Sequence, residues 1–302
     1  MEDHRAAPSV PDLFSAETNN NQFQVRTLEG CFFCDVRDNI VGDIIKKHRF
    51  WEYAETEWVK TIVRPGDVVI DAGANLGWYT VIMARLVGSK GHVLAFEPEP
   101  RNFELLAKNV AWNGFADRCS LFNLALFEHE ATHRFELSPT NLGDHRVRIG
   151  SPVQVEREDL YDEEVRSEIA VQSKSLDAVV SQAGLDDHPI RLWKMDTQGS
   201  EVSILRGAKR TLERTEYLLT EYWPYGLARM GHNADHFVSC VQDYFVEFCR
   251  VERDQLTFQP IDRLREHLSI PSDTPCGESM YVFRKSESFA TTISQVMPTQ
   301  QE

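Results

Sequence analysis

The sequence lacks the features that mark membrane-spanning and secreted proteins. No uninterrupted apolar stretch reaches about 18 residues, the length that a transmembrane helix requires. The N-terminal segment MEDHRAAPSVPDLFSAETNNNQ has neither the basic start nor the apolar centre of a secretory signal peptide. We therefore expect a cytoplasmic location and no membrane partner.

Basic residues are also fewer than acidic ones. The chain has 32 Lys and Arg residues against 47 Asp and Glu residues, which gives a formal net charge of -15 at pH 7. Binding to nucleic acid phosphates needs a concentrated face of Lys and Arg side chains. The composition therefore disfavours a nucleic acid partner.

The cysteines form no pattern typical of a metal or disulfide site. Six are scattered over 302 residues, which indicates reduced and mostly packed thiols. Cys31 and Cys34 have C-x-x-C spacing, but their segment alternates like a strand, in which positions three apart face opposite sides. Because no second Cys/His pair accompanies them, we expect packed thiols and no metal.

The two ends of the chain differ from its middle. Residues 1–20 and 286–302 are polar with little apolar periodicity, which predicts disordered tails. Alternation over residues 22–43 predicts one or two hairpins, and an apolar face over residues 51–63 predicts a helix. Residues 21–65 therefore form an N-terminal extension, whose hairpins either cover a sheet edge or pair with a second copy in a homodimer.

Residues 66–285 alternate short apolar runs with helical patterns and form the main domain. This alternation is typical of a parallel sheet covered by helices on both faces, an α/β fold. Ligands bind where the carboxyl ends of such strands meet. An insertion at about residues 128–172 lacks a clear pattern. The predicted strands are DVVIDAG, HVLAFEP, CSLFNLAL, IRLWKMD, EYLLTEY, FVEFCRV and SMYVFRK, and the predicted helices cover residues 77–87, 101–112, 173–183, 200–212 and 234–243.

The stretch DAGANLG, residues 71–77, joins a buried strand to a helix. Gly73 and Gly77 can adopt backbone angles that are closed to other residues and let a ligand approach the main chain. Asp71 ends the strand, where its carboxylate can accept hydrogen bonds from an ammonium group. A dinucleotide-binding turn would read G-x-G-x-x-G, and an acidic residue would repel the pyrophosphate. An NAD-dependent oxidoreductase is therefore disfavoured.

Glu97 ends the next predicted strand. An acidic side chain at that position can accept hydrogen bonds from two ribose hydroxyls. Together with Asp71 it predicts a ligand that joins a nucleoside to an amino acid, which describes S-adenosylmethionine. Two other interpretations stay open: Asp71 caps the turn, or Glu97 is a solvated strand end.

Three parts of the sequence carry a resemblance to a known family. DAGANLG, the TNLGD turn at residues 140–144, and KMDTQGSE followed by LRGA resemble the FkbM family of S-adenosylmethionine-dependent methyltransferases, over about residues 50–225. The resemblance implies a Rossmann-like, class I methyltransferase fold with a mostly parallel seven-stranded sheet. It also implies S-adenosylmethionine as the cofactor.

The resemblance assigns roles to individual residues. The departures from the family pattern are Thr197, Gln198 and Ser200, which bear on the acceptor pocket. The resemblance places Asp71, Gly73, Asn75 and Gly77 in the cofactor loop, Glu97 and Pro98 at the ribose, Asn123 and Ala125 beside the adenine, and Asp196 nearest the transferred methyl group.

Methyl transfer to a hydroxyl needs a group that takes the hydroxyl proton. Asp196 is the first candidate, although it either acts as this base or binds the cofactor's amino group. Glu221 ends the following strand and either contacts substrate or supports the site. His145 comes near the acceptor if the insertion closes over it, and is otherwise a solvated loop histidine. Trp223 and Tyr225 form an aromatic acceptor wall or pack beneath a loop.

The sequence thus predicts an S-adenosylmethionine-dependent methyltransferase. The expected acceptor is a hydroxyl group on a small molecule, such as a sugar or a secondary metabolite. Two alternatives keep the fold: a methyltransferase that acts on nitrogen, and a non-catalytic cofactor-binding or scaffold protein. The presence of Asp71, Glu97 and Asp196 disfavours the scaffold.

Overall fold

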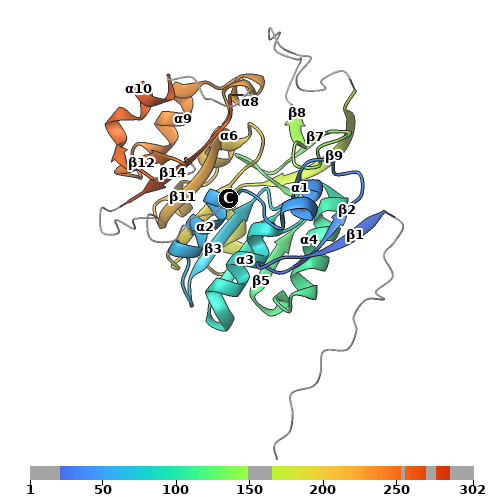
Figure 1. Cartoon of the computed structure of the whole chain (residues 1–302). Coiled ribbons are helices and arrows are strands. Elements are labelled where there is room, and N and C mark those ends of the chain that lie inside the picture. The colour runs from blue at the N-terminus through green and yellow to red at the C-terminus, as the bar shows by residue number, and fades with distance from the viewer. Residues whose placement is uncertain (1–20, 149–164, 253–255, 270–276, 286–302) are drawn as a thin grey trace, which may run out of the picture.

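The computed structural model describes residues 21–148, 165–252, 256–269 and 277–285. The predicted tails lie outside these ranges. A large sheet forms the middle layer of the molecule (Figure 1). Its strands, in spatial order, are β5 (Cys119–Phe122), β4 (His92–Phe96), β3 (Val68–Ala72), β10 (Ile190–Met195), β11 (Thr215–Tyr222), β14 (Ser279–Arg284), β12 (Glu247–Arg250) and β13 (Gln259–Pro260).

The sheet confirms the predicted α/β class. Strands β5, β4, β3, β10 and β11 pair in parallel. Strand β14 inserts between β11 and β12 and runs antiparallel to both. The seven predicted strands are all present, and β13 adds a two-residue edge strand in the described part of the chain.

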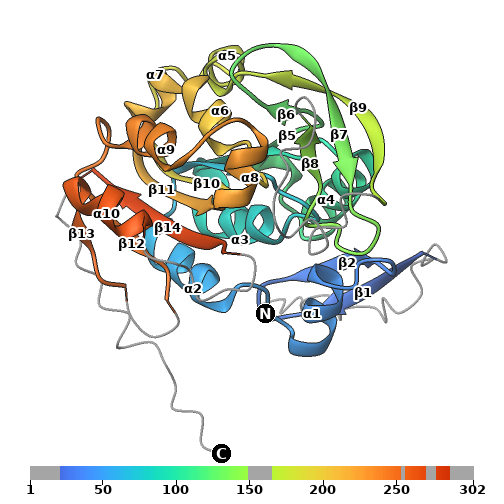
Figure 2. The same cartoon turned by 90° about the horizontal axis from the view of Figure 1, so that it is seen from above.

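Helices cover both faces of this sheet (Figure 2). Because neighbouring strand residues point to opposite faces, Val69 and Leu192 pack on one side, and Ile70 and Trp193 on the other. The first side is covered by α2 (Tyr53–Ile62), α3 (Trp78–Val87) and α4 (Pro100–Trp112), with α1 (Val41–His48) beside the N-terminal hairpin. The second is covered by α5 (Leu176–Gln182), α6 (Glu201–Arg206), α7 (Lys209–Leu212), α8 (Pro224–Arg229), α9 (Ala234–Val241) and α10 (Leu264–Leu268). Short 3-10 turns cover Gly88–Lys90, Ala116–Arg118 and Ile261–Arg263.

The N-terminal extension contains one hairpin, β1 (Gln22–Arg26) and β2 (Cys31–Asp35). It packs on helix α4 instead of covering a sheet edge, which corrects one of the two predicted placements. Fully buried Asn109 of α4 joins the two by accepting from Phe33 N at 2.7 Å and donating to Phe33 O at 3.0 Å. Cys34 is a buried free thiol whose pKa burial raises to about 12, in keeping with a packing role.

Helix α1 was not predicted, because its first residues fall in the range 22–43 that was interpreted as hairpins. The Asp38 carboxylate instead accepts from Val41 N at 3.1 Å and Gly42 N at 2.9 Å. A carboxylate that binds the first free N–H groups stabilises the start of a helix. This helix and the segment that follows it bring residues 40–41 and 51–52 to the cavity at the carboxyl edge of the sheet.

The insertion was predicted to be irregular, and this is wrong for its described residues. It forms a second sheet in the order β6 (Ala125–Leu126), β9 (Ser167–Lys174), β7 (Ala131–Leu137) and β8 (Arg146–Arg148). A small core of Phe127, Phe135, Val147 and Val171 holds it together. Residues 149–164 lie outside the described part of the chain.

Two predicted helices differ in extent. The helix expected at residues 173–183 begins only at Leu176, where Ser175 Oγ accepts from Ala178 N, because β9 continues to Lys174. The helix expected at residues 200–212 is divided into α6 and α7 at Gly207. A Cβ on Gly207 would lie 2.5 Å from Phe127 O, so the backbones of the two layers touch there.

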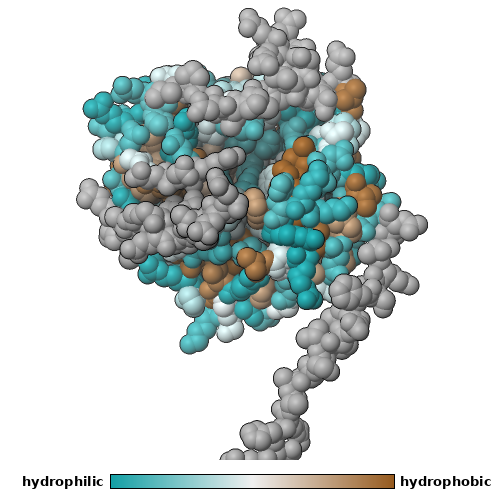
Figure 3. Space-filling view, viewed as in Figure 1, coloured by the Kyte–Doolittle hydropathy of each residue, from teal (hydrophilic) through white to brown (hydrophobic). Residues whose placement is uncertain are grey.

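Within the described ranges, no helix has both the length and the hydrophobicity to cross a bilayer. Figure 3 shows hydrophobic residues in small separate groups among hydrophilic ones on one face of the molecule. Scattered exposed apolar residues of this kind are normal and need no partner.

Candidate cofactor and acceptor site

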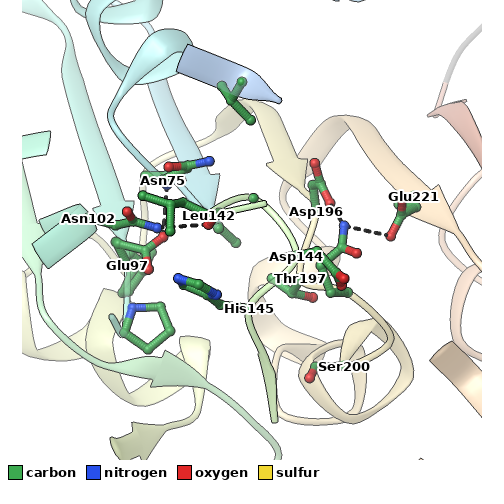
Figure 4. A pocket seen from close by; sticks show the side chains of 18 of the residues that line it. Asn75, Glu97, Asn102, Leu142, Asp144, His145, Asp196, Thr197, Ser200 and Glu221 are labelled. Atoms are coloured by element: carbon green, nitrogen blue, oxygen red, sulfur yellow. Dashed lines mark hydrogen bonds between the residues drawn. The ribbon is translucent and has the colours of Figure 1, made fainter. Parts of the chain in front are cut away.

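A cavity of about 360 Å³ lies at the carboxyl ends of the central strands. Its walls come mainly from the ends of β3, β4, β10 and β11, the starts of α3 and α4, residues 124–126, the loop at residues 141–145, and residues 40–41 and 51–52 of the N-terminal extension. Figure 4 shows side chains from the strand ends, from helix α4 and from the loop at residues 141–145 converging on it. The volume falls within the range of small-molecule and cofactor sites.

The glycines of DAGANLG allow two close backbone contacts. Gly73 has φ 78°, and a Cβ there would lie 1.9 Å from the carbonyl oxygen of Asp196. Gly77 has φ 92°, and a Cβ there would lie 2.8 Å from Leu106 Cδ1 on α4. Gly73 lines the cavity, whereas Gly77 lies outside the lining.

Asp71 does not reach the cavity, which corrects the predicted contact with an ammonium group. It is fully buried, and its Oδ2 accepts from Thr80 Oγ1 at 2.5 Å. Burial raises its pKa, while the nearby Lys194 opposes the shift. Asp71 and Lys194 are paired neighbours on β3 and β10. Asp71 therefore acts from beneath the cavity as a countercharge to Lys194.

Glu97 lines the cavity, as predicted. Its Oε2 accepts from Asn75 N at 2.8 Å and its Oε1 from Glu99 N at 2.9 Å. Burial raises its pKa to about 8. Each carboxylate oxygen has two lone pairs, so both can still accept a hydrogen bond from a ligand hydroxyl.

The other predicted cofactor residues divide into lining and supporting ones. Asn75, Pro98 and Ala125 line the cavity. Asn123 does not, because its Nδ2 donates to Glu97 O at 2.9 Å and to Pro98 O at 3.1 Å. Asn123 thus fixes the strand end that presents Glu97.

Three polar atoms in residues lining the cavity have no hydrogen-bond partner among the described residues. They are Asn75 Oδ1, Asn102 Oδ1 and Ser200 Oγ. Asn102 is only 2% exposed, and its Nδ2 donates to Leu142 O at 3.0 Å. A buried polar atom left unpaired costs about 1–3 kcal/mol. The three atoms therefore indicate a polar ligand, and sequence reasoning missed Asn102.

Asp196 lies where the resemblance placed it, at the end of β10 and in the cavity wall. Its Oδ2 accepts from Lys194 Nζ at 3.3 Å and its Oδ1 from Gln198 Nε2 at 2.8 Å. Gln198 also donates to Glu221 Oε2 at 3.3 Å (Figure 4). The same amide thus links both predicted carboxylates.

Lys194 is a site residue that sequence reasoning missed. It lines the cavity although it is 3% exposed. Burial disfavours its charged form, but Asp196, Asp71 and Glu52 together raise its pKa. Its ammonium lies 5.0 Å from the ring centroid of Tyr79. Lys194 is therefore held as a cation that orients Asp196.

Glu221 lines the cavity and lies in β11. Burial raises its pKa well above the ordinary value, and the nearby Asp196 and Glu201 raise it further. The protonated form is therefore favoured, and in that form Glu221 donates a hydrogen bond.

His145 also lines the cavity, so the insertion does bring it to the site. Its predicted role as a base is not supported. Nδ1 accepts from Ser138 N at 3.0 Å, which leaves the proton of the neutral ring on Nε2. Burial lowers its pKa to about 4. His145 therefore presents an N–H donor to the cavity.

The rings of Trp223 and Tyr225 pack against each other at 5.2 Å between centroids, but they are placed differently toward the cavity. Trp223 lines the cavity, whereas Tyr225 lies outside the lining. Fully buried Arg146 lies 5.6 Å from the ring of Trp223 and 6.0 Å from that of Tyr225, and its Nε donates to Glu136 at 3.3 Å. Only Trp223 can form part of an acceptor wall.

Comparison with known proteins agrees with this arrangement. Residues 71–262 match the Methyltransferase FkbM domain, which is more than half of the chain. The chain belongs to the FkbM methyltransferase family. This confirms the resemblance inferred from DAGANLG, TNLGD and KMDTQGSE.

Two curated relatives and one solved structure are similar to the chain over part of their length. The FkbM chain is 30% identical over 170 residues to 2-O-methyltransferase NoeI of Sinorhizobium fredii, covering 54% of this chain and 66% of that protein. It is 30% identical over 165 residues to the 31-O-demethyl-FK506 methyltransferase FkbM of Streptomyces tacrolimicus, covering 49% and 61%. The crystal structure of Methyltransferase FkbM from Methylobacillus flagellatus aligns with 15% identity and a TM-score of 0.40, covering 82% and 62%.

Within the described ranges, no group of three or more His, Cys, Asp or Glu side chains is arranged to hold a metal ion. Glu201, an acidic residue near the cavity, stabilises the loop after β10: its Oε1 accepts from Thr197 N and Thr197 Oγ1, both at 2.9 Å.

The buried acidic residues predict how the stability of this FkbM protein depends on pH. Burial raises the pKa of Glu97 and Glu52 to about 8 and that of Glu201 to about 7. Between about pH 7 and pH 8.5 the folded protein therefore holds protons that the unfolded chain has lost. The free energy of unfolding is expected to fall as pH rises, by up to about 1.4 kcal/mol per pH unit for each fully linked proton.

Urea denaturation of the ligand-free protein at several pH values in this window measures the effect. Glu97→Gln removes one titrating group and should reduce the slope. A free energy of unfolding that rises between about pH 7 and pH 8.5 would contradict the expectation.

Proposed function

We propose that this FkbM-family protein uses S-adenosylmethionine to methylate a hydroxyl oxygen on a small molecule. The observation that carries the proposal is one cavity that presents Glu97 at one strand end and Asp196 at another. The names of two relatives, a 2-O-methyltransferase and a 31-O-demethyl-FK506 methyltransferase, support oxygen as the acceptor. A cytoplasmic location and a homodimer stay predictions from the sequence.

The residues at the Glu97 end fit the nucleoside part of this cofactor. Glu97 can accept from two ribose hydroxyls, and Asn75 and Asn102 contribute unpartnered oxygens. Pro98 and Ala125 supply apolar surface for the adenine. When bound, the cofactor supplies an electrophilic methyl group.

The residues at the Asp196 end fit the acceptor. The Asp196 carboxylate takes the proton of the hydroxyl group, and Lys194 and Gln198 hold that carboxylate in place. Protonated Glu221 donates a hydrogen bond to the acceptor. Trp223 closes this end against water.

Isothermal titration calorimetry with S-adenosylmethionine tests the cofactor assignment. The wild type is expected to bind, and Glu97→Gln is expected to bind about tenfold or more weakly, a loss of about 1.4 kcal/mol. The reason is that the amide leaves one oxygen to serve both a backbone N–H and a ribose hydroxyl. Exposed Glu104 on α4 provides the control Glu104→Gln, with unchanged affinity. A wild type that does not bind would overturn the proposal.

A further inference from the structure

A carboxylate from outside the family match lines the same cavity. Glu52 immediately precedes helix α2, whereas the match begins at residue 71. It lines the cavity with Lys194 and Asp196. Its Oε2 accepts from the hydroxyl of Tyr79 on α3 at 2.8 Å. The N-terminal extension thus contributes charge to the site as well as packing.

The backbone at Glu52 is held in an unusual conformation. Its φ is 41° and its ψ is 67°, in the left-handed region that disfavours residues with a Cβ. Neighbouring bonds maintain it: Thr56 N donates to Glu52 O at 2.8 Å, and Thr56 Oγ1 donates to Trp51 O at 2.9 Å. Trp78 Nε1 donates to Thr56 Oγ1 at 2.9 Å. Strained residues that their surroundings hold in place cluster at ligand sites.

The charges around Glu52 do not balance. Lys194 is a single ammonium group, and it influences Asp71, Asp196 and Glu52 together. Burial raises the pKa of Glu52 to about 8, although Lys194 opposes the shift and Tyr79 donates to the carboxylate. Asp196 and Glu55 raise it further. This end of the cavity therefore favours a cation over an anion.

Asp71 and Asp196, the two other carboxylates that influence Lys194 most, are less available to a ligand than Glu52. Asp71 lies outside the cavity lining; its Oδ2 accepts from Thr80, and its Oδ1 is buried without a partner among the described residues but is not exposed to the cavity. Both oxygens of Asp196 accept, one from Lys194 and the other from Gln198. Among the described residues, no donor binds Glu52 Oε1.

We propose that Glu52 binds the ammonium group at the amino acid end of the methyl donor. This inference rests on the proposed function, because it assumes S-adenosylmethionine as the ligand. It transfers to Glu52 the role that the sequence assigned to Asp71. It also makes the N-terminal extension part of the cofactor site.

Calorimetry with two ligands tests the proposal. S-adenosylhomocysteine carries the amino acid part, and 5′-methylthioadenosine is the same nucleoside thioether without it. Glu52→Gln keeps the size of the side chain and removes its charge. It is expected to weaken S-adenosylhomocysteine binding by about tenfold or more and to leave 5′-methylthioadenosine binding unchanged, because charge-assisted hydrogen bonds are the strong ones.

Glu55→Gln is the matched control. Glu55 lies on α2, one turn after Glu52, and burial raises its pKa as well, but it lies outside the cavity lining. Because Glu55 acts on Glu52 only as a nearby charge, Glu55→Gln is expected to change S-adenosylhomocysteine affinity much less than Glu52→Gln does and to leave 5′-methylthioadenosine affinity unchanged. Tyr79→Phe, which removes the hydroxyl that holds Glu52 Oε2, is a second variant. It should weaken S-adenosylhomocysteine selectively but by a smaller factor.

The outcomes separate the two proposals. Unchanged S-adenosylhomocysteine binding in Glu52→Gln overturns the inference alone, as does an equal loss for both ligands, which indicates a structural role. A wild type that binds neither ligand overturns the proposed function and the inference with it. Selective loss in Glu52→Gln, and a smaller selective loss in Tyr79→Phe, support it.

Discussion

The Asp196→Asn variant is expected to transfer methyl groups about 10²–10⁴-fold more slowly than the wild type, with little change in cofactor binding. An amide oxygen can still accept from Lys194, so the side chain keeps much of its position. It cannot take a proton from the acceptor hydroxyl. Single-turnover rates with S-adenosylmethionine and a small polyol or sugar acceptor, followed by mass spectrometry, measure the loss.

Glu221→Gln provides the contrast to this variant. Because burial and nearby carboxylates favour the protonated form of Glu221, a neutral amide keeps its ability to donate, and the rate should fall much less. Exposed Asp187→Asn controls for the loss of a charge and should leave the rate unchanged. If Asp196→Asn keeps the wild-type rate and Glu221→Gln loses it, the assignment of the base is reversed.

The central sheet was predictable because its strands are buried on both faces. Runs such as DVVI in β3 and IRLW in β10 are nearly continuous in apolar residues, since both neighbouring layers are helices. The second sheet has one exposed face, so β7 alternates polar and apolar residues: Thr132 and Arg134 are exposed, whereas Phe135 is buried. Such short, half-polar strands resemble loops in a single sequence.

The site residues that lie in recognisable sequence motifs were predictable. Gly73, Glu97 and Asp196 lie in motifs and line the cavity as expected. Glu52 and Asn102 were missed, because only tertiary packing brings the start of α2 and the first turn of α4 to the strand ends. No spacing in the sequence links those positions.

The roles of two residues were misassigned for local reasons. The position of Asp71 at a strand end did not reveal that its carboxylate is enclosed with Thr80 beneath the cavity. The sequence likewise could not show that the backbone N–H of Ser138 fixes the tautomer of His145. In both cases the role depends on one hydrogen-bond partner, Thr80 for Asp71 and Ser138 for His145, that the sequence motif does not identify.

Gly73→Ala is expected to lower the free energy of unfolding by about 3 kcal/mol or more, from the left-handed backbone and the forced contact together. The new Cβ would lie 1.9 Å from Asp196 O, and a backbone atom cannot move aside as a flexible side chain can. Strands β3 and β10 must therefore separate at their carboxyl ends. Urea denaturation measures the loss of stability, and calorimetry measures the loss of cofactor binding.

Gly66→Ala separates the effect of the left-handed backbone from the effect of the forced contact. Gly66 has φ 92°, also left-handed, but a Cβ there meets nothing within 4 Å. Gly66→Ala should lower the free energy of unfolding by about 1–2 kcal/mol, because only the left-handed backbone disfavours it, and should leave cofactor binding unchanged. Equal losses in the two variants would show that the β3 and β10 ends are not in contact. A larger loss for Gly73→Ala, with weaker binding, would show that this contact positions Asp196.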